Sequence, residues 1–378
     1  MAEIVDVIVL GLGANGSSAL YNLSKTNKNV LGIDRFTPPH NLGSSHGESR
    51  IIRQAYHESP MYVPFVLEAY NLWFEIEALA NEKLLLKTGG IMLGTETASA
   101  VMGAKLSAGL NNIPYEYLNY NELKERYPAF KPSKDTVGVV EKNAGILFPE
   151  KCINAFLTQA QKNGAAIHNN EIVLSINPKS DYVELITSKG TYKAEKLIIS
   201  AGAWTGELLP RLNLPLTVER QVLYWFKNNN TRQQSYILPE NLPIYIWEYL
   251  PGEIFYGFPD LGNGIKIAHH HAGENIKPDK LSQDVSETEI ASMKKITDRY
   301  LNIDLEYNYS AVCMYTNTPD ENFIIDYHPE HKNIIIASPC SGHGFKFSSL
   351  TGKILSDMAI GKKPDFDISP FRIARQYV

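Results

Sequence analysis

The sequence predicts an α/β fold of two interleaved domains, one with a Rossmann-like parallel sheet and one with an antiparallel sheet. Three observations support this prediction. The chain has 378 residues, more than one hydrophobic core usually holds. A buried strand, a glycine turn and a helix follow one another near each end of the chain. Alternating apolar segments typical of β-hairpins lie between these two ends.

Composition and charge favour a globular protein with a small ligand. Lys and Arg number 36 and Asp and Glu number 41, so the formal net charge is −5, without a block of like charges. We therefore expect no nucleic-acid partner and no membrane partner. No apolar run reaches the roughly 20 residues of a membrane span, and the N-terminus lacks a signal-peptide pattern. We expect a cytoplasmic protein with a small-molecule substrate.

The first element is a strand over residues 4–10, "IVDVIVL", followed by the turn "GLGANG" and a helical apolar pattern. Gly11, Gly13 and Gly16 permit a tight turn, a close approach of the backbone to a pyrophosphate, and close packing of helix on strand. A second strand, "NVLGID", ends at Asp34, whose carboxylate is suited to accept hydrogen bonds from a ribose. Together these features predict a dinucleotide site, with a merely structural glycine turn as the alternative.

A later strand over 196–205, "KLIISAGAWT", follows two hairpin segments and completes the same sheet far along the chain. The nucleotide domain is therefore expected to be discontinuous. Discontinuity favours FAD over NAD by analogy between folds, because a compact NAD domain is usually completed sooner.

Two cations follow a glycine-rich loop in "NLGSSHGESRIIRQAY". Arg50 and Arg53 are three residues apart, so in a helical turn they share one face. That face suits a carboxylate, and the alternative is a solvated pair of surface arginines.

A strand over 264–270 would point Lys266, Ala268 and His270 to one side. The three successive histidines of this segment diverge on a strand and lack carboxylates at ligand spacing, so we expect no metal. Near the C-terminus, a strand over 333–338, a turn at Gly342 and Gly344, and a helix from about residue 345 repeat the first pattern. The second helix end is suited to face a partial negative charge, and a plain glycine loop is the alternative.

Three cysteines, Cys152, Cys313 and Cys340, are widely spaced and odd in number, which argues against disulfides and a zinc site. Cys313 lies in the alternating stretch "SAVCMYTNTPDENF". A buried thiol and an attachment point for a cofactor both remain open at this stage.

Several segments resemble the monomeric sarcosine oxidase and N-methyltryptophan oxidase family, in the same order and over essentially the whole chain. The segments are "DVIVLGLGANG", "PPHNLGSSHGESRIIRQAY", "YGFPDLGNGIKIAHHH", "VCMYTNTPDENFIIDYHPEHKN" and "SGHGFKFSS". The resemblance implies a monomer whose FAD-binding Rossmann-like domain is interleaved with an antiparallel-sheet substrate domain. It implies FAD attached covalently to Cys313, and oxidation of a secondary amine with O2 reduced to hydrogen peroxide.

The resemblance also assigns residues. The substrate carboxylate is expected to bind Arg53 and Lys346, with the backbone of Gly342 and the side chain of Tyr315 nearby. Lys266, Arg50, His270 and Tyr256 are the expected catalytic residues, with Lys266 near flavin N5. The expected cofactor-binding residues are Gly11, Gly13, Gly16, Asp34, His46, Ser49, Cys313 and Gly344.

The expected FAD domain comprises residues 1–80, 146–215 and 316–378, and the expected substrate domain comprises residues 81–145 and 216–315. The leading substrates are N-methyl amino acids such as sarcosine or N-methyltryptophan, and the alternatives are a cyclic imino acid such as pipecolate or proline. An NAD-dependent dehydrogenase and a flavin-binding module without turnover are the rival classes.

Three features depart from the family pattern. Ser45 stands where bacterial enzymes usually have a second histidine, and "SSHG" is similar to the peroxisomal branch. Pro339 and Cys340 precede the second glycine turn, so we expect a pocket of different size. The tail "FRIARQYV" has no Ser-Lys-Leu address, so the similarity to the peroxisomal branch need not extend to location.

Overall fold

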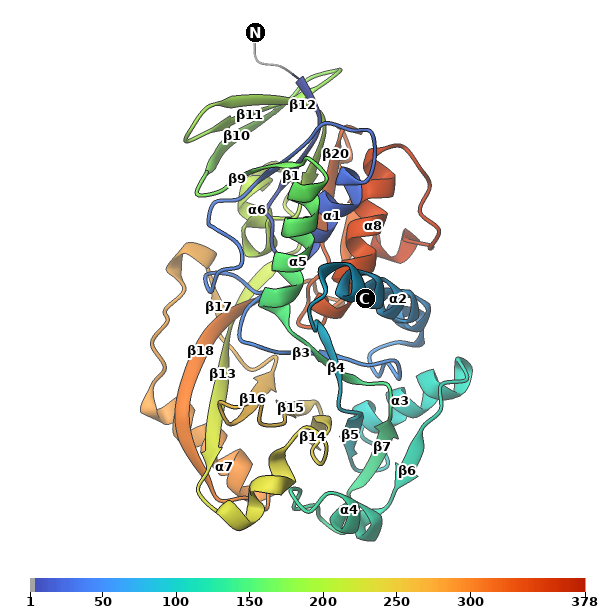
Figure 1. Ribbon diagram of the computed structural model, residues 1–378, viewed down its shortest axis with the longest axis vertical. Coiled ribbons are helices and arrows are strands. Elements are labelled where there is room, and N and C mark those ends of the chain that lie inside the picture. The colour runs from blue at the N-terminus through green and yellow to red at the C-terminus, as the bar shows by residue number, and fades with distance from the viewer. Residues whose placement is uncertain (1–3, 378) are drawn as a thin grey trace.

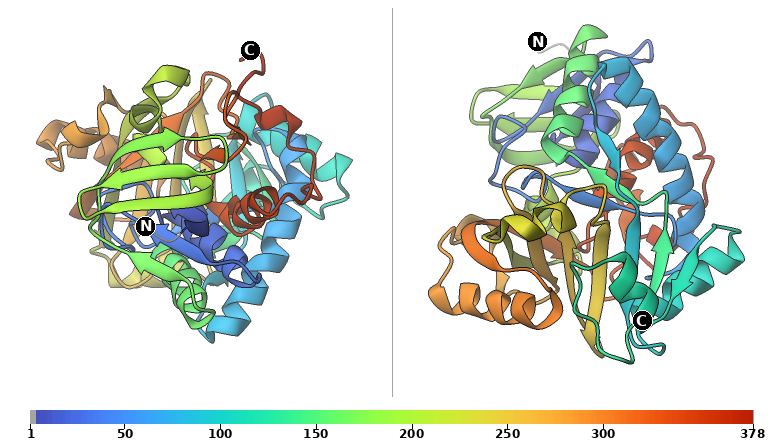
Figure 2. Two further views of the ribbon diagram at one scale, coloured as in Figure 1. Left: turned by 90° about the horizontal axis from the view of Figure 1, so that it is seen from above. Right: turned by 60° about the horizontal axis from the view of Figure 1, so that its bottom comes forward.

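A computed structural model describes residues 4–377. The molecule is elongated, with one sheet in its upper part and a second in its lower part (Figure 1). Several helices pack together beside the upper sheet, and others pack against strands of the lower sheet (Figure 2). The helices are α1 Ala14–Ser24, α2 Val63–Ala80, α3 Ser99–Leu110, α4 Tyr120–Arg126, α5 Pro149–Lys162, α6 Thr205–Leu208, α7 Glu287–Tyr300 and α8 Ser348–Ala359.

The upper sheet has eight strands within the described residues, and its centre is parallel. The strand order is β10-β11-β12-β1-β2-β9, with β20 beside β12 and β19 beside β20. β1 pairs in parallel with β2 and β12, and β12 pairs in parallel with β20. The strands are β1 Ile4–Leu10, β2 Val30–Ile33, β9 Ala166–His168, β10 Val173–Pro178, β11 Val183–Thr187, β12 Thr191–Ile199, β19 Ile324–Tyr327 and β20 Ile334–Ser338.

These strands come from three separate stretches of the chain, as the discontinuity argument predicted. β2 and β20 are buried throughout, and β1 and β12 are buried at their carboxyl ends, as expected for strands at the centre of a parallel sheet. The helices α1, α5 and α8 pack together beside this sheet.

The lower sheet is largely antiparallel, with β14 and β5 as a parallel pair. β13 and β18 are its longest strands and bend along one side of the molecule (Figure 1). The order is β17-β13-β16-β15-β14-β5-β7-β6, with β18 on β13. The strands are β5 Gly90–Gly94, β6 Glu116–Leu118, β7 Val137–Glu141, β13 Thr217–Asn228, β14 Ile244–Leu250, β15 Glu253–Phe258, β16 Ile265–His270, β17 Asn275–Ile276 and β18 Leu305–Asn317.

A small sheet of β3 Arg50–Ile52, β8 Gly145–Leu147 and β4 Leu85–Lys87 lies where the chain passes between the two large sheets. The expected division into two domains at the stated boundaries stays a prediction.

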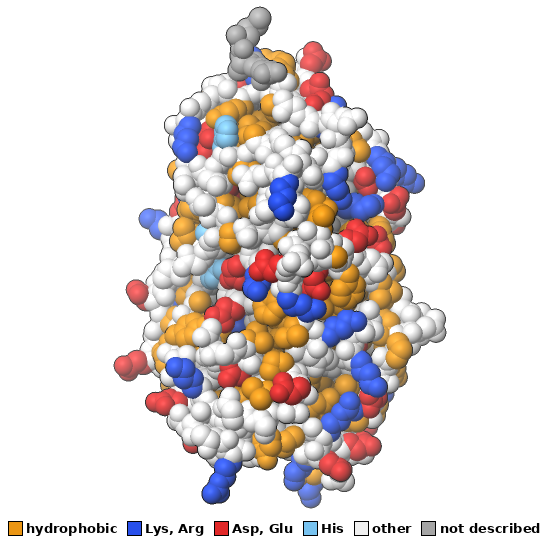
Figure 3. Space-filling model, in the orientation of Figure 1, with side chains coloured by type: hydrophobic (Ala, Val, Ile, Leu, Met, Phe, Trp, Pro, Cys, Tyr) orange, Lys and Arg blue, Asp and Glu red, His pale blue; other side chains and the backbone are white. Residues whose placement is uncertain are grey.

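On the face shown in Figure 3, basic and acidic side chains are interspersed. Among residues 4–377, no helix has the length and apolar character that crossing a membrane requires, and no group of three or more His, Cys, Asp or Glu is arranged around a possible metal position.

Candidate active site

Two cavities adjoin at the carboxyl ends of the parallel strands, where ligands bind in open α/β sheets. The turn cavity, of about 500 Å³, is lined by the first glycine turn, the end of β2 and Trp204. The inter-sheet cavity, of about 120 Å³, is lined by residues of the lower sheet and of the second glycine turn. Ala14, Asn15, Ser44, Ser45 and Cys340 line both cavities, so one long ligand is able to occupy both.

The first glycine turn fits the role that the sequence predicts for it. Gly11 has a φ of +85°, and a Cβ there would lie 2.6 Å from the carbonyl oxygen of Ser200. A Cβ on Gly16 would lie 1.7 Å from the carbonyl oxygen of Gly11, so helix α1 approaches the turn only because Gly16 has no side chain. A Cβ on Gly13 would meet only Ser45 Oγ, at 3.8 Å, so that side of the turn is open.

Helix α1 has Gly13 at its N-cap position, with no side-chain hydrogen bond there and no acidic residue in its first turn. Its first N–H groups are therefore available to an anion, and the helix dipole favours one. Gly13 and Ala14 line the turn cavity, so this helix end faces a site of the right size.

Asp34 follows β2 as predicted and is buried. Its carboxylate accepts hydrogen bonds from the backbone N–H groups of Leu12, at 2.6 Å, and Phe36, at 2.8 Å. Burial raises the pKa of Asp34, and these hydrogen bonds oppose the change. Asp34 thus fixes the glycine turn to β2, and its contact with a ribose stays a prediction.

Several buried polar atoms of the two cavities have no partner among the described residues. They include Asn15 Oδ1, Arg35 Nε and Thr316 Oγ1, on residues that line the cavities. Buried polar groups are normally hydrogen-bonded, so unpaired ones in a cavity indicate a polar ligand. Together with the open helix end, they fit a phosphate-containing cofactor that spans both cavities, such as FAD.

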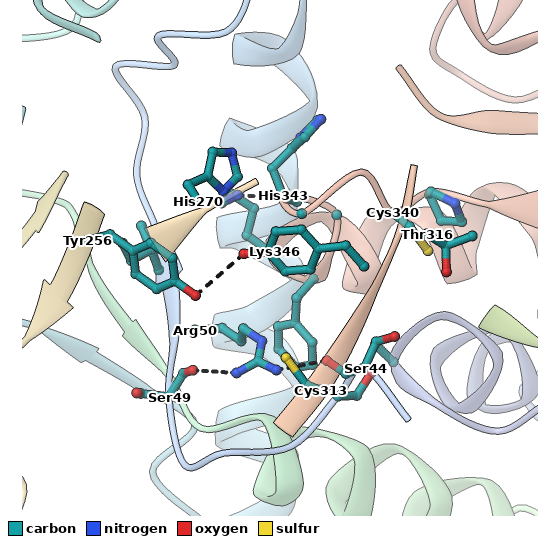
Figure 4. Close-up of a pocket in the computed structure, with 18 of the residues that line it drawn as sticks. Ser44, Ser49, Arg50, Tyr256, His270, Cys313, Thr316, Cys340, His343 and Lys346 are labelled. Atoms are coloured by element: carbon teal, nitrogen blue, oxygen red, sulfur yellow. Dashed lines mark hydrogen bonds between the residues drawn. The ribbon is translucent and has the colours of Figure 1, made fainter. Parts of the chain in front are cut away.

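Cys313 lies on β18 and lines the inter-sheet cavity (Figure 4). It packs with Leu223, Trp225 and Ala268, whereas Met314 packs in a different cluster with Ala203 and Val218. The side chains of Cys313 and Met314 thus pack on different faces, as strand alternation requires, although Met314 also borders the cavity. Burial raises the pKa of the Cys313 thiol, and the cations Arg50 and Lys266 oppose that change.

The other two cysteines differ in their surroundings. Cys152 is buried in α5 within the hydrophobic core and lines neither cavity. Cys340 lines both cavities, near Thr316 (Figure 4). Cys313 and Cys340 are thus the two thiols that border the candidate cofactor site within the described residues.

The predicted helical turn at Arg50 and Arg53 is wrong, because Arg50–Ile52 form strand β3. The backbone pairs with β8, and this tertiary pairing overrides the local spacing. Both arginines nevertheless line the inter-sheet cavity. Arg50 donates to the carbonyl oxygens of Ser49 and Ser44, at 2.8 and 2.7 Å.

Arg53 is 1% exposed and holds an ion pair with Glu58. Its Nη2 donates to the two carboxylate oxygens of Glu58 at 2.7 and 2.5 Å and lies 2.8 Å from Nδ1 of His57. Nε and Nη1 have no partner within residues 4–377. Burial alone would raise the pKa of Glu58, but Arg53 and neighbouring cations hold it well below its usual range.

Lys346 is buried beside this pair. Its ammonium donates to the carbonyl oxygen of His343 at 2.6 Å and lies 5.2 Å from the ring centre of Tyr56. The Arg53 guanidinium lies over the same ring, at 4.4 Å. Burial and Arg53 lower the pKa of Lys346 to about 7. Arg53 and Lys346 therefore form two adjacent cations with one internal carboxylate, an arrangement suited to a substrate carboxylate.

An aromatic wall closes the other side of the cavity (Figure 4). The hydroxyls of Tyr256 and Tyr315 are 3.4 Å apart, and the ring of His270 lies 5.7 Å from that of Tyr315. A Cβ on Gly342 would lie 2.6 Å from Tyr315 and 2.9 Å from His270, so the second glycine turn packs directly against this wall. Burial lowers the pKa of His270 well below its usual value, which keeps the ring neutral.

Lys266 does not line the cavity but lies behind Ser49, on strand β16. Its side chain is enclosed, with Nζ 2.8 Å from the carbonyl oxygens of Gly47 and Ser49 and 3.0 Å from Ser49 Oγ. The ammonium also lies 4.6 Å from the ring centre of Phe258. The prediction that Lys266 and His270 share one wall is therefore only partly met, since only His270 borders the cavity.

The remaining predicted cofactor residues lie close to these groups. Ser49 lines the inter-sheet cavity, and Gly344 begins the turn of helix over Phe345–Phe347 that precedes α8. A Cβ on Gly344 would lie 1.7 Å from the carbonyl oxygen of Pro339, so a glycine is required there. His46 is buried, and burial followed by the charge of Arg50 lowers its pKa to about 3.

Sequence reasoning missed Glu58, His57 and the carbonyl of His343. Glu58 follows Arg53 by five residues in a segment without periodicity. Its ion pair with Arg53 depends on a turn that the local sequence does not predict. The available signal was an acidic residue close to an arginine already assigned to a carboxylate.

The chain is similar to known flavin enzymes along its whole length. The family model described as FAD dependent oxidoreductase matches residues 6–358. The monomeric sarcosine oxidase of Streptomyces avermitilis is 40% identical, over 95% of this chain and 94% of the relative. The N-methyl-L-tryptophan oxidase of Salmonella heidelberg is 34% identical, over 98% of each chain.

Solved structures share the fold. The open form of NikD, described as an unusual amino acid oxidase essential for nikkomycin biosynthesis, superposes with a TM-score of 0.86 at 21% identity. The match covers 98% of this chain and 97% of NikD.

Proposed function

Because the chain belongs to the FAD dependent oxidoreductase family, we propose that it oxidises the secondary amine of an N-methyl amino acid to an imine, with reduction of O2 to hydrogen peroxide. The imine is then hydrolysed by water. Relatives named for sarcosine and for N-methyl-L-tryptophan, at 40% and 34% identity, support this substrate class. The name of the first relative also supports a monomer.

The pair of Arg53 and Lys346 is the observation that carries the proposal. Both cations are buried at the inter-sheet cavity, and two nitrogens of Arg53, Nε and Nη1, have no partner among residues 4–377. A planar guanidinium binds a carboxylate through two parallel hydrogen bonds, and a lysine adds a point charge. An amino acid substrate would thus be held by its carboxylate, in competition with Glu58.

The aromatic wall would orient the rest of the substrate. Tyr256, Tyr315 and His270 leave a mostly apolar surface with few donors, so they exclude water around the amine. Burial lowers the pKa of His270, so its ring stays neutral and does not repel a substrate cation. The amine must lose its proton before oxidation, because only the lone pair of the neutral amine promotes loss of hydrogen from the adjacent carbon.

FAD, when bound, supplies the two-electron acceptor for the amine and the donor to O2. The first glycine turn and the start of α1 would hold its diphosphate, and Asp34 its ribose. The inter-sheet cavity, with Arg50 and Ser49 at one wall, would hold the ring system, and the buried His46 lies outside the lining of both cavities. Lys266 would supply the fixed positive charge that stabilises O2 as it gains an electron.

Covalent attachment at Cys313 belongs to this proposal. The thiol is buried at the cavity wall, where burial raises its pKa and the cations Arg50 and Lys266 oppose that change. Acid precipitation of the purified protein tests it: flavin should stay with the pellet. Cys313→Ala should move the flavin to the supernatant, whereas Cys340→Ala, at the other thiol of the site, should not. Flavin released from the wild type by acid would refute the covalent bond.

Oxygen consumption tests the substrate class. Sarcosine and N-methyltryptophan should consume O2 and yield peroxide, while the corresponding N-methyl amine without a carboxylate should not. Equal rates of O2 consumption with and without the carboxylate on the amine would contradict the role of Arg53 and Lys346.

A further inference from the structure

The backbone turn at Gly47 and Glu48 separates two groups of opposite charge. Gly47 and Glu48 have φ angles of +94° and +69°, so the chain is left-handed at two successive residues. The N–H groups of both residues donate to Oε1 of Glu150, at 2.7 and 3.2 Å. Glu150 lies in the first turn of α5.

The opposite side of the same turn faces Lys266. The carbonyl oxygens of Gly47 and Ser49 and the hydroxyl of Ser49 accept from the Lys266 ammonium. Lys266 is 2% exposed, and no carboxylate contacts it within the described residues. Three acceptors match the three donors of a protonated lysine.

One peptide group therefore bridges the carboxylate and the ammonium. In the planar trans peptide between residues 47 and 48, N–H and C=O point in opposite directions. The N–H points to Glu150 and the C=O to Lys266. The dipole of this peptide is thus aligned favourably with both charges, and Glu150 fixes its direction.

A second cation, Arg50, lies close to Lys266, so the acceptors of this turn have to hold two positive charges. Arg50 donates to the carbonyl oxygen of Ser49 that Lys266 also uses, so two cations share one acceptor. Burial and Arg50 lower the pKa of Lys266, and Glu150 and Glu48 oppose that change. The carboxylate of Glu48 is already engaged, because it accepts from Trp225, Asn263 and Tyr309.

We propose that Glu150 is a positioning residue for the oxidative half-reaction, which holds the turn over residues 47–49 so that its carbonyl groups seat the Lys266 ammonium. The inference rests on the proposed function in one respect, that Lys266 assists the reaction of the reduced flavin with O2. Within the described part of the chain, the Glu150 carboxylate accepts hydrogen bonds only from backbone N–H groups.

The test compares Glu150→Ala, Glu150→Gln and the control Lys151→Ala. Lys151 occupies the same helical turn, has a half-exposed side chain and pairs with Glu82 at 3.4 Å. Stoichiometric dithionite reduces the flavin of each variant, and mixing with O2 gives the reoxidation rate without any amine. Hydrogen exchange of the segment 44–50, followed by mass spectrometry, reports on the turn itself.

We expect Glu150→Ala to slow reoxidation by about tenfold, which corresponds to about 1.4 kcal/mol of lost transition-state stabilisation, and to speed exchange in 44–50. Glu150→Gln keeps an oxygen acceptor but loses the charge, so its reoxidation should fall between Ala and wild type with little change in exchange. Lys151→Ala should match the wild type in both measurements. Unchanged reoxidation in Glu150→Ala would overturn the proposal, as would an equal loss in Lys151→Ala.

A merely structural role for Glu150 predicts a different pattern, in which amine-driven reduction of the flavin slows as much as reoxidation. That result would also overturn the proposal. Failure of every N-methyl amino acid to reduce the wild-type flavin would reject the proposed function, while the dithionite and exchange measurements would still decide the role of Glu150.

Discussion

Nη2 of Arg53 donates to both carboxylate oxygens of Glu58, at 2.7 and 2.5 Å. This places an internal carboxylate where the proposed function requires the carboxylate of the substrate. Two Arg53 nitrogens, Nε and Nη1, have no partner in the described part of the chain. The pair thus neutralises a buried cation in the free protein and leaves it donors for a ligand.

Glu58→Gln should strengthen the binding of carboxylate ligands and lower the stability of the ligand-free protein. Removing one charge of a buried ion pair costs about 3 kcal/mol of stability, and a bound carboxylate should restore most of it. Thermal unfolding with and without propionate measures both effects. Glu125→Gln, at an exposed position of α4, is the matched control. Equal propionate stabilisation of wild type and Glu58→Gln would show that Glu58 does not compete with ligands.

Binding of a carboxylate should depend on the ionisation of Lys346, whose pKa burial lowers to about 7. Below pH 7 the amine is charged and binds the ligand, and above pH 7 the charged fraction falls. The Kd of propionate should therefore rise by up to about tenfold for each pH unit above 7. Flavin absorbance during titrations from pH 6 to 9 provides the measurement. Lys346→Met should bind weakly and lose this dependence, and a Kd that falls with pH would contradict it.

Gly13 and Gly16 should differ in what an added methyl group disturbs. Gly16→Ala places a Cβ 1.7 Å from a backbone oxygen, so the protein should fold poorly. Gly13→Ala meets only Ser45 Oγ at 3.8 Å, so it should fold but bind less FAD. Gly109→Ala, with open space in α3, serves as control. The melting temperature and the flavin-to-protein ratio distinguish these outcomes, and a fully loaded, stable Gly16→Ala would refute the packing argument.

Lys266→Met should slow reoxidation by O2 far more than anaerobic reduction by an amine. The ammonium is enclosed by backbone oxygens and two aromatic rings, so its charge is held in place rather than solvated. Stopped-flow measurement of the two half-reactions checks this prediction. Equal losses in both would assign Lys266 a general structural role.

The sequence predicted the parts of the fold that local patterns determine. The strand, glycine turn and helix over 4–24 were predictable because buried parallel strands are continuous apolar runs and because glycine is required at the turn. The second glycine turn and α8 followed for the same reasons. The separate packing of Cys313 and Met314 agrees with the alternating pattern of their strand.

Features set by distant segments could not be predicted in this way. Arg50 lies in a strand because residues 145–147 pair with it, almost a hundred positions later. Glu150 was missed because its partners are backbone N–H groups of a left-handed turn. Backbone partners cannot be recognised from the pattern of side chains in a sequence. Glu58 was missed because a carboxylate next to an arginine is usually a solvated surface pair.

Anaerobic mixing of the purified protein with sarcosine, N-methyltryptophan, pipecolate and proline, each in a separate experiment, tests the central claim most directly. Sarcosine or N-methyltryptophan should bleach the flavin absorbance, and Arg53→Met should require about 10 to 100 times more substrate for the same rate, since hydrogen bonds to charged groups contribute about 1.5–3 kcal/mol. Flavin that stays oxidised with both N-methyl amino acids would contradict the account, and bleaching by pipecolate or proline alone would move the substrate class to cyclic imino acids.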